Sequence, residues 1–376
     1  MTLDAQDRLD SPDWLAEADP ADMLRQVASS AAQVRTAVLA TQEVDLGEVI
    51  DAGRPRAIVV TGMGGSGVAG DVLAAVSGPG CPVQVTAVHD YQLPAWVGAA
   101  DLVIAVSCSG ATEETLAASA EAVRRGCRLI GVGGRDSALA ELAEQARAPF
   151  IGVQSAGMPR STLWALSVPL VVVASQLELI EVSAADYEAA ATELERISQL
   201  CRPGSETFVN PAKLLALDLA GTLPMIWGTS PLAGVAAYRF ACQLSENAKY
   251  PSVYGVLPEA NHNQVVTFDG LFAGGPDGPD GTDGPATGLP PVPLRLVLLR
   301  DSHEHPQVAR RREESARLAA GRGIEVTELA AAGSGPLERL ASLVQVIDYA
   351  TVYLAIAQGI DPGPVAPIAE LKARIA

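Results

Sequence analysis

The chain has 376 residues, of which 48% are apolar and 19% charged, and its formal net charge at pH 7 is −18. This length is natural for two domains and allows a large core to be buried. The negative charge argues against nucleic acid and against an anionic membrane as partner, because both are bound through basic patches.

Residues 1–50 are expected to form a helical segment, because Met23, Val27, Ala31 and Val34 recur on one helical face. From Arg56 onward the pattern changes to short, β-branched, nearly continuous apolar runs separated by helical segments. The predicted strands cover residues 57–62, 83–88, 101–107, 128–133 and 149–153. Such an alternation is typical of a parallel sheet that is covered by helices on both faces. We therefore expect a first doubly wound α/β domain over residues 51–183.

An Ala/Glu-rich helix is predicted to connect the domains over residues 184–204, and a second α/β domain follows over residues 205–358. Its predicted strands cover residues 223–228, 294–300 and 324–329, with helices over 232–249 and 337–358. Residues 274–291 are rich in Gly, Pro and Asp and are expected to form a flexible surface insertion. Residues 359–376 are predicted to form a proline-punctuated tail that ends in a short helix.

A glycine-rich loop, TGMGGSGVAGD (61–71), follows the first predicted strand. Gly62, Gly64 and Gly67 satisfy G-x-G-x-x-G, and Asp90 lies after the next strand at the spacing of a ribose-binding acid. A dinucleotide site is therefore one interpretation of this loop. The other is that the glycines serve only a tight strand-to-helix turn.

The third predicted strand runs into SCSGATEETL (107–116), which places the hydroxyls of Ser107, Ser109 and Thr112 in one turn before a helix. Hydroxyls and the unpaired N–H groups of a helix N-terminus can together hold a phosphate dianion. A simple helix N-cap needs only one hydroxyl, so three of them favour the phosphate. A phosphate monoester fits this turn better than a pyrophosphate does.

Two further polar features lie beyond these loops. In PRSTLWALSVPL (159–170), Arg160 begins an apolar helix, where the helix dipole disfavours a cation unless an anion lies nearby. The stretch Gln243–Asn263, QLSENAKYPSVYGVLPEANHN, gathers Glu246, Lys249, Glu259 and His262. A solvated helix end followed by a loop would also account for this stretch, and Arg239 could form an ion pair along the same helical face.

The motifs GMGGSGVAGD, SCSGATEETL, PRSTLWALSVPL, QLSENAK and LPEANHN, in this order, resemble the bifunctional phosphoglucose/phosphomannose isomerase family. The resemblance runs from about residue 20 to the C-terminus and implies two flavodoxin-like sugar-isomerase (SIS) domains. It further implies that the sugar phosphate is bound by Gly64, Gly65, Ser66, Ser107, Ser109 and Thr112, with Lys372 in the tail closing over it.

By the same resemblance, Arg160 stabilises an enediolate, Glu246 moves the proton, and His262 opens the sugar ring. The implied enzyme is an aldose–ketose isomerase for fructose 6-phosphate and glucose 6-phosphate, without cofactor or metal, and a homodimer. By the resemblance, His262 is expected to enter the active site from the partner subunit, although the sequence by itself leaves open whether it acts within its own subunit. The resemblance also leaves open whether mannose 6-phosphate is a substrate, because the tail lacks the family's threonine. Cys108 and Ala111 stand where the family usually has an aromatic residue and an asparagine.

Four other functions remain to be weighed against this one. A sensor built on the same domains would bind sugar phosphates without using Glu246 or His262. An oxidoreductase would rest on the glycine loop alone. A glucosamine-forming synthase is disfavoured, because no cysteine follows Met1 as a nucleophile. A zinc enzyme is disfavoured, because the four histidines form no convincing metal-binding pattern and His303 and His305 sit together in one loop.

The expected location is the cytoplasm. The five cysteines are scattered and show no CxxC spacing, which is typical of reduced thiols. No apolar signal segment is visible at the acidic N-terminus, and the apolar run Trp164–Ala174 is too short to cross a bilayer.

Overall fold

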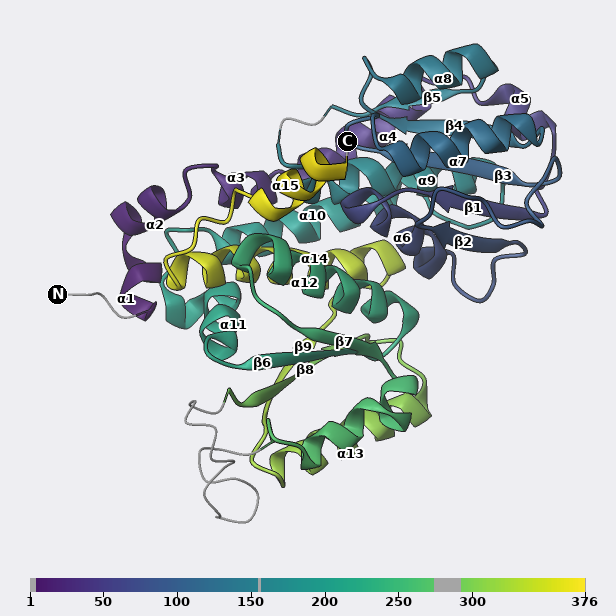
Figure 1. Cartoon of the computed structure of the whole chain (residues 1–376). Coiled ribbons are helices and arrows are strands. Elements are labelled where there is room, and N and C mark those ends of the chain that lie inside the picture. Colours follow the sequence, from purple (N-terminus) through teal and green to yellow (C-terminus); the bar gives the residue numbers. More distant parts are fainter. Residues whose placement is uncertain (1–4, 155–156, 274–291, 376) are drawn as a thin grey trace. The chain divides into compact units, whose positions relative to one another are not determined.

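The computed structural model describes residues 5–154, 157–273 and 292–375 (Figure 1). The chain divides into two compact units. The five-stranded unit comprises Ser29–Glu195 and Gly335–Glu338, and the four-stranded unit comprises Met1–Ala28, Arg196–Ser334 and Arg339–Ala376. The ranges 1–50 and 184–204, each expected to be one segment, are therefore shared between the units. The insertion expected at 274–291 lies outside the described residues.

Within the described residues, from Ala5 onward, five helices precede the first strand. They are α1 (Ala5–Asp10), α2 (Pro12–Ala18), α3 (Met23–Ala28), α4 (Ser30–Gln42) and α5 (Gly47–Asp51). The four residues predicted to share one helical face are all buried, but Met23 and Val27 belong to α3 whereas Ala31 and Val34 belong to α4. The chain passes from the four-stranded to the five-stranded unit at this break. Helical periodicity predicted the burial and missed the break at Ser29.

The five-stranded unit holds one parallel sheet in the order β2-β1-β3-β4-β5. Its strands are β1 (Ala57–Thr61), β2 (Gln84–Val88), β3 (Leu102–Ser107), β4 (Arg128–Gly133) and β5 (Phe150–Gly152). All five predicted strands are present. The strand order reverses between β1 and β3, and in open α/β sheets ligands bind at this point, beyond the carboxyl ends of the strands.

Helices cover both faces of this sheet, which explains why its central strands β1 and β3 are buried at every residue, whereas the edge strand β2 is only partly buried. On one face lies α6 (Val68–Ser77), where Gly70 touches Val60 and Ala87. On the other face lie α7 (Glu113–Arg124) and α8 (Ala138–Ala146), which share a buried cluster with Val59 and Val103. Helix α9 (Leu163–Gln176) follows β5 and is buried over most of its length.

The four-stranded unit holds a second parallel sheet in the order β7-β6-β8-β9. Its strands are β6 (Leu223–Gly228), β7 (Val253–Val256), β8 (Leu294–Arg300) and β9 (Glu325–Ala330). Three of them were predicted, and β7 was not. This edge strand exposes Val253 and Tyr254 by 41% and 44%, so it lacks the continuous apolar run that marked the others.

The remaining helices are α10 (Ala184–Cys201), α11 (Pro211–Leu219), α12 (Pro231–Ala248), α13 (Pro306–Ala320), α14 (Pro336–Ala357) and α15 (Ala366–Ile375). Helices α12 and α14 lie on one face of the four-stranded sheet and α13 lies on the other (Figure 1). By length and composition α14 could cross a membrane, with a mean hydropathy of 1.6. However, 94% of that window is buried in the structure, as in the core helix of a soluble domain.

Candidate functional site

The glycine loop after β1 makes a tight turn against β3. A side chain at Gly62 would lie 2.9 Å from the Val106 carbonyl oxygen and 3.0 Å from that of Ser66, so no larger residue fits there. Residues Gly64–Ser66 form a 3-10 turn, η1, which Gly64 enters with a φ of +55°. Glycine adopts this conformation at no steric cost. Packing and backbone geometry therefore account for these glycines without a dinucleotide.

The glycine loop is bonded to the hydroxyl-rich loop after β3. The Ser66 Oγ, 7% exposed, accepts a hydrogen bond from the Cys108 backbone N–H at 3.1 Å. The hydroxyls of Ser107 and Thr112 lie 2.9 Å apart. The structure thus brings together three of the predicted phosphate-binding residues, Ser66, Ser107 and Thr112. Ser109, in the same loop, accepts a bond from the Ala111 N–H at 3.2 Å.

Helix α7 begins at Glu113 without a side-chain cap. Thr112 occupies the N-cap position, yet its hydroxyl bonds to Ser107 rather than to an N–H of the first helical turn. The Thr112 side chain therefore does not cap the helix, which was the alternative to phosphate binding. N–H groups at a helix N-terminus that no side chain caps can bond to an anion, which the helix dipole also favours.

Arg160 lies beside this loop edge within the five-stranded unit. It belongs to the 3-10 turn η2 (Pro159–Ser161), which precedes α9, and is 4% exposed. A side chain at Gly65 would meet the Pro159 oxygen at 3.4 Å and the Arg160 Cα at 3.5 Å. The glycine loop and the arginine turn are therefore in contact at Gly65.

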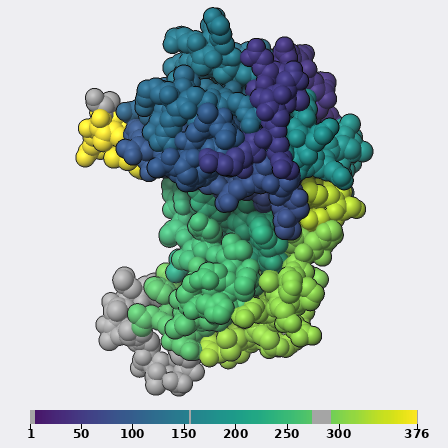
Figure 2. All heavy atoms as spheres, turned by 90° about the vertical axis from the view of Figure 1, so that its right-hand side faces the viewer, coloured from purple at the N-terminus to yellow at the C-terminus, as the bar shows by residue number. Residues whose placement is uncertain are grey.

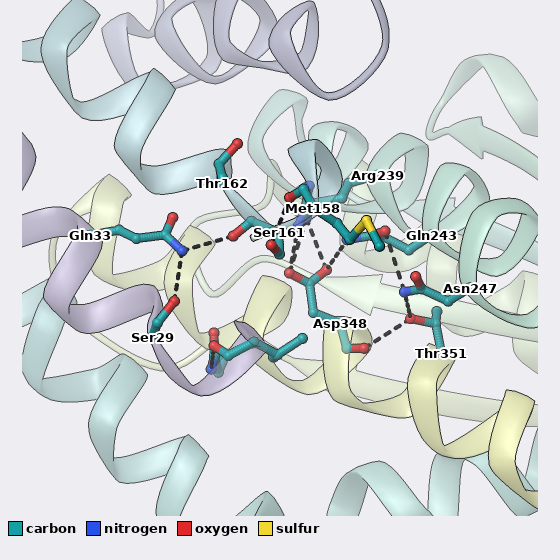
Figure 3. Close-up of polar contacts among 12 residues, drawn as sticks. Ser29, Gln33, Met158, Ser161, Thr162, Arg239, Gln243, Asn247, Asp348 and Thr351 are labelled. Carbon is teal, nitrogen blue, oxygen red and sulfur yellow. Dashed lines mark hydrogen bonds and ion pairs between the residues drawn. The ribbon is translucent and has the colours of Figure 1, made fainter. Parts of the chain in front are cut away.

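Gln33 on α4 holds the arginine turn in place (Figure 3). Its Nε2 donates to the Ser161 carbonyl oxygen at 2.8 Å, and its Oε1 accepts from the Ala165 N–H at 3.3 Å. Ser29 bonds to the same amide at 3.0 Å. Sequence analysis missed Gln33, because nothing in its local pattern indicates a contact 128 residues away.

The residues after β2 bear on the dinucleotide interpretation. Asp90 accepts a hydrogen bond from the N–H of its neighbour Tyr91 at 2.6 Å, which is a local turn contact. His89, which sequence analysis also passed over, places its Nδ1 2.8 Å from the Gly62 carbonyl oxygen. A side chain at Gly67 would collide with the His89 ring at 2.7 Å. The last glycine of the motif is thus required by this imidazole.

In the four-stranded unit, Glu246 lies in the last turn of α12 and is half-buried. Lys249, which follows the helix in the left-handed conformation, donates to the Glu246 carbonyl oxygen at 2.9 Å and to that of Asp361 at 3.1 Å. The ammonium therefore caps the helix and bonds it to the start of the C-terminal tail. This contact gives Lys249 a structural role in the polar stretch.

His262 lies at the opposite edge of the same sheet from Glu246. The Leu257 N–H, just after β7, bonds to the Gly228 carbonyl oxygen at the end of β6, from where α12 begins. Because α12 connects parallel strands, it runs back to the amino edge, and Glu246 lies about 22 Å along its axis from the start. The exposed His262 follows in the 3-10 turn η4 (Glu259–His262).

Contacts of η4 also place His262 on the other face of the sheet. Its neighbour Asn261 donates to the Ser315 hydroxyl on α13 at 2.7 Å. Helix α13 covers the face opposite to α12 (Figure 1). The four-stranded unit of one chain therefore does not bring Glu246 and His262 together.

The carboxyl edge of the four-stranded sheet is occupied by an internal carboxylate. Asp301 follows β8, the strand that corresponds to β3 in sheet order, and is 3% exposed. It accepts hydrogen bonds from the Ser230 hydroxyl at 2.7 Å and the Arg339 Nε at 2.9 Å. The hydroxyl and cation that an external anion would need are used here internally. The five-stranded unit is therefore the candidate phosphate site.

Lys372 belongs to α15, which has no buried residue among those described. The C-terminal residues, at the yellow end of the colour scale, stand at the surface of the space-filling view (Figure 2). Elsewhere in residues 5–154, 157–273 and 292–375, no group of three or more His, Cys, Asp or Glu side chains could hold a metal ion.

Comparisons with known proteins identify relatives of this chain. Residues 208–375 match the family model described as bacterial phospho-glucose isomerase C-terminal SIS domain. The bifunctional phosphoglucose/phosphomannose isomerase of Caldicellulosiruptor bescii is 34% identical over 85% of this chain and 89% of its own. The Aquifex aeolicus protein of the same name is 29% identical over 84% of this chain and 89% of its own.

Two solved structures share the fold at low sequence identity. A hypothetical protein from Thermus thermophilus has a TM-score of 0.70 at 16% identity and covers 98% of this chain and 93% of its own. A putative phosphosugar isomerase from Clostridium difficile has a TM-score of 0.69 at 14% identity and covers 93% and 97%. Both units therefore have the fold of these proteins.

Proposed function

Because the chain belongs to the bifunctional phosphoglucose/phosphomannose isomerase family, we propose that it interconverts fructose 6-phosphate with glucose 6-phosphate, and with mannose 6-phosphate as a second aldose. The reaction moves one proton between adjacent carbons through an enediolate. Substrate and product are therefore isomers, and no external oxidant or reductant is needed. We propose that the enzyme is cytoplasmic, because its five cysteines are scattered and show no CxxC spacing.

The observation that carries the proposal is the loop edge of the five-stranded unit. Ser107 and Thr112 hold their hydroxyls 2.9 Å apart beside a helix N-terminus that no side chain caps. Gly65 lies against Arg160 next to them. These contacts support a site in which the hydroxyls and N–H groups bind a phosphate monoester and the turn that carries Arg160 lies beside the glycine loop.

The chemistry then assigns a role to each charged group. A carbanion next to a carbonyl is stabilised as an enediolate, and Arg160 supplies positive charge for the oxyanion. Glu246 is the base that removes the proton from one carbon and returns it to the next. Its half-buried position limits its contact with water. Both steps leave the phosphate untouched.

His262 is proposed to open the sugar ring from a second copy of the chain. Ring opening and proton transfer occur on the same small sugar, so both groups must come within hydrogen-bond reach of it. Within one chain, Glu246 and His262 lie at opposite edges and on opposite faces of a sheet. A symmetric homodimer lets each site take Glu246 from one subunit and His262 from the other.

A coupled assay for glucose 6-phosphate formed from fructose 6-phosphate tests the proposal directly, and a parallel assay with mannose 6-phosphate tests the second aldose. We expect turnover with fructose 6-phosphate by the folded protein. Binding of the sugar phosphate without turnover would favour a sensor instead. Thermal protection by NAD(P) would favour the oxidoreductase.

A further inference from the structure

A line of buried polar side chains joins α12 to α14. We call it the polar seam, and its members are Arg239, Gln243 and Asn247 on α12 with Asp348 and Thr351 on α14 (Figure 3). Each is 3% exposed or less. The Arg239 guanidinium reaches the Asp348 carboxylate at 2.6 Å, Gln243 reaches it at 3.3 Å, and Asn247 donates to Thr351 at 2.9 Å.

Stability does not account for the polar seam. Burial raises the pKa of Asp348 above its ordinary value of 3.8, and the neighbouring Arg239 opposes this shift without cancelling it. The carboxylate therefore costs free energy to bury in its charged form. Buried ion pairs of this kind can often be replaced by apolar side chains without loss of stability. The helix α14 is otherwise largely apolar, with a mean hydropathy of 1.6.

The polar seam is explained instead by the need to fix the orientation of α12 on α14. Residues 239, 243 and 247 recur every four positions, so they form one stripe along α12. Apolar side chains tolerate small slides and rotations of one helix on another, whereas an arginine fork and an amide each bond well in one register only. The last contact, Asn247 to Thr351, is one residue from Glu246. The polar seam therefore limits rotation of the last turn of α12, which carries Glu246.

We propose that the polar seam positions Glu246, with Asp348 and Thr351 as positioning residues for proton transfer; this inference rests on the proposed isomerase function. Proton transfer depends steeply on the placement of the base, and a shift of about 1 Å can cost about a hundredfold in rate. Binding of the sugar phosphate depends on the five-stranded unit. Loss of the polar seam should therefore lower kcat and leave KM nearly unchanged.

The double variant R239M/D348L tests this, because it replaces the ion pair with apolar side chains. We expect a melting temperature equal to or above that of the wild type, a kcat about 10- to 100-fold lower with fructose 6-phosphate, and a KM within about threefold. The matched control is R339M/D301L, which removes another buried arginine–aspartate pair of α14, at the start of α12. Its kcat should stay within about twofold of wild type.

A second pair of variants keeps the test decisive if the double variant does not fold. Thr351→Val keeps the shape but removes the oxygen that Asn247 bonds to, and Thr351→Ser keeps the oxygen. We expect kcat to fall several-fold in the first and to recover in the second. An unchanged kcat in T351V and R239M/D348L overturns the positioning role. Absence of turnover in the wild type would overturn the proposed function, and this inference with it.

Discussion

The Ser66 hydroxyl oxygen accepts a hydrogen bond from the Cys108 backbone N–H across 3.1 Å. These residues belong to loops that follow different strands, and the bond makes the two loops one surface. The adjacent pair of hydroxyls on Ser107 and Thr112 completes that surface. Its groups bind phosphate in our proposal, so their loss should affect binding and spare the chemical step.

Thr112→Val should raise the KM for fructose 6-phosphate about tenfold and leave kcat within about twofold. A hydrogen bond to a charged group contributes about 1.5–3 kcal/mol, and the phosphate keeps its charge throughout the reaction. Initial rates in the coupled assay provide the measurement. Ser119→Ala removes a hydroxyl that bonds within α7, to the Thr115 carbonyl oxygen, and should leave KM unchanged. Equal KM values for T112V and wild type would remove Thr112 from the site.

Glu246→Gln should lower kcat by about a hundredfold or more, because an amide cannot accept the proton that the base removes. Fructose 6-phosphate should still raise the melting temperature of this variant. The control is Glu259→Gln, which alters an exposed carboxylate in the same polar stretch. Near-normal turnover by E246Q, or an equal loss in E259Q, would place the base elsewhere.

Mixing two inactive variants tests whether His262 acts from the partner subunit. Glu246→Gln and His262→Asn dimers are dissociated together and allowed to reassociate. In a symmetric dimer with shared sites, half the molecules carry one intact site of two, so about a quarter of wild-type activity should return. If Glu246 and His262 act within one chain, every site keeps one defect and no activity returns.

The ion pair of Arg56 with Asp101 makes the free energy of unfolding of the five-stranded unit depend on pH in the acidic range. Burial alone would raise the pKa of Asp101, but hydrogen bonds from Arg56 and from the Gly98 N–H hold it below its ordinary value of 3.8. The folded state then binds fewer protons than the unfolded state. This stabilisation is present above pH 3.8 and is lost as the pH falls through the lower, folded value.

Asp101→Asn should therefore lower the free energy of unfolding at neutral pH by about 1–3 kcal/mol. Urea unfolding, followed from about pH 6 to about pH 3, should show this difference shrinking as the wild-type carboxylate is protonated. Asp51→Asn, an exposed position in the same unit, serves as control and should differ little at any pH. A difference between D101N and wild type that does not depend on pH would contradict the linkage.

Local patterns predicted most of the fold because they report burial. The central strands β1 and β3 are covered on both faces, so each reads as an apolar run whatever its neighbours are. The edge strand β7 escaped prediction because Val253 and Tyr254 meet solvent. The break at Ser29 escaped because the apolar spacing continues across it while the chain changes units.

The candidate site divides in the same way. Ser66, Ser107, Thr112 and Arg160 follow strands or begin helices, so the sequence by itself placed them at one sheet edge. Gln33 and Asp348 carry no local signal, since their partners lie 128 and 109 residues away. Only the packing of helices brings them into contact, because a side-chain hydrogen bond needs atoms within about 3 Å and no sequence spacing sets that distance.

The sequence alone thus determined the two parallel-sheet domains, the hydroxyl-rich loop and the types of residue required for proton transfer. Glu246 and His262 stand 16 positions apart in the sequence, and this spacing alone does not decide whether they lie close together. The tertiary structure separates them, because α12 must run back across the sheet before β7 can pair in parallel with β6. That crossover carries Glu246 to one edge of the sheet and His262 to the other. Two residues of one short polar stretch therefore lie in different parts of the fold.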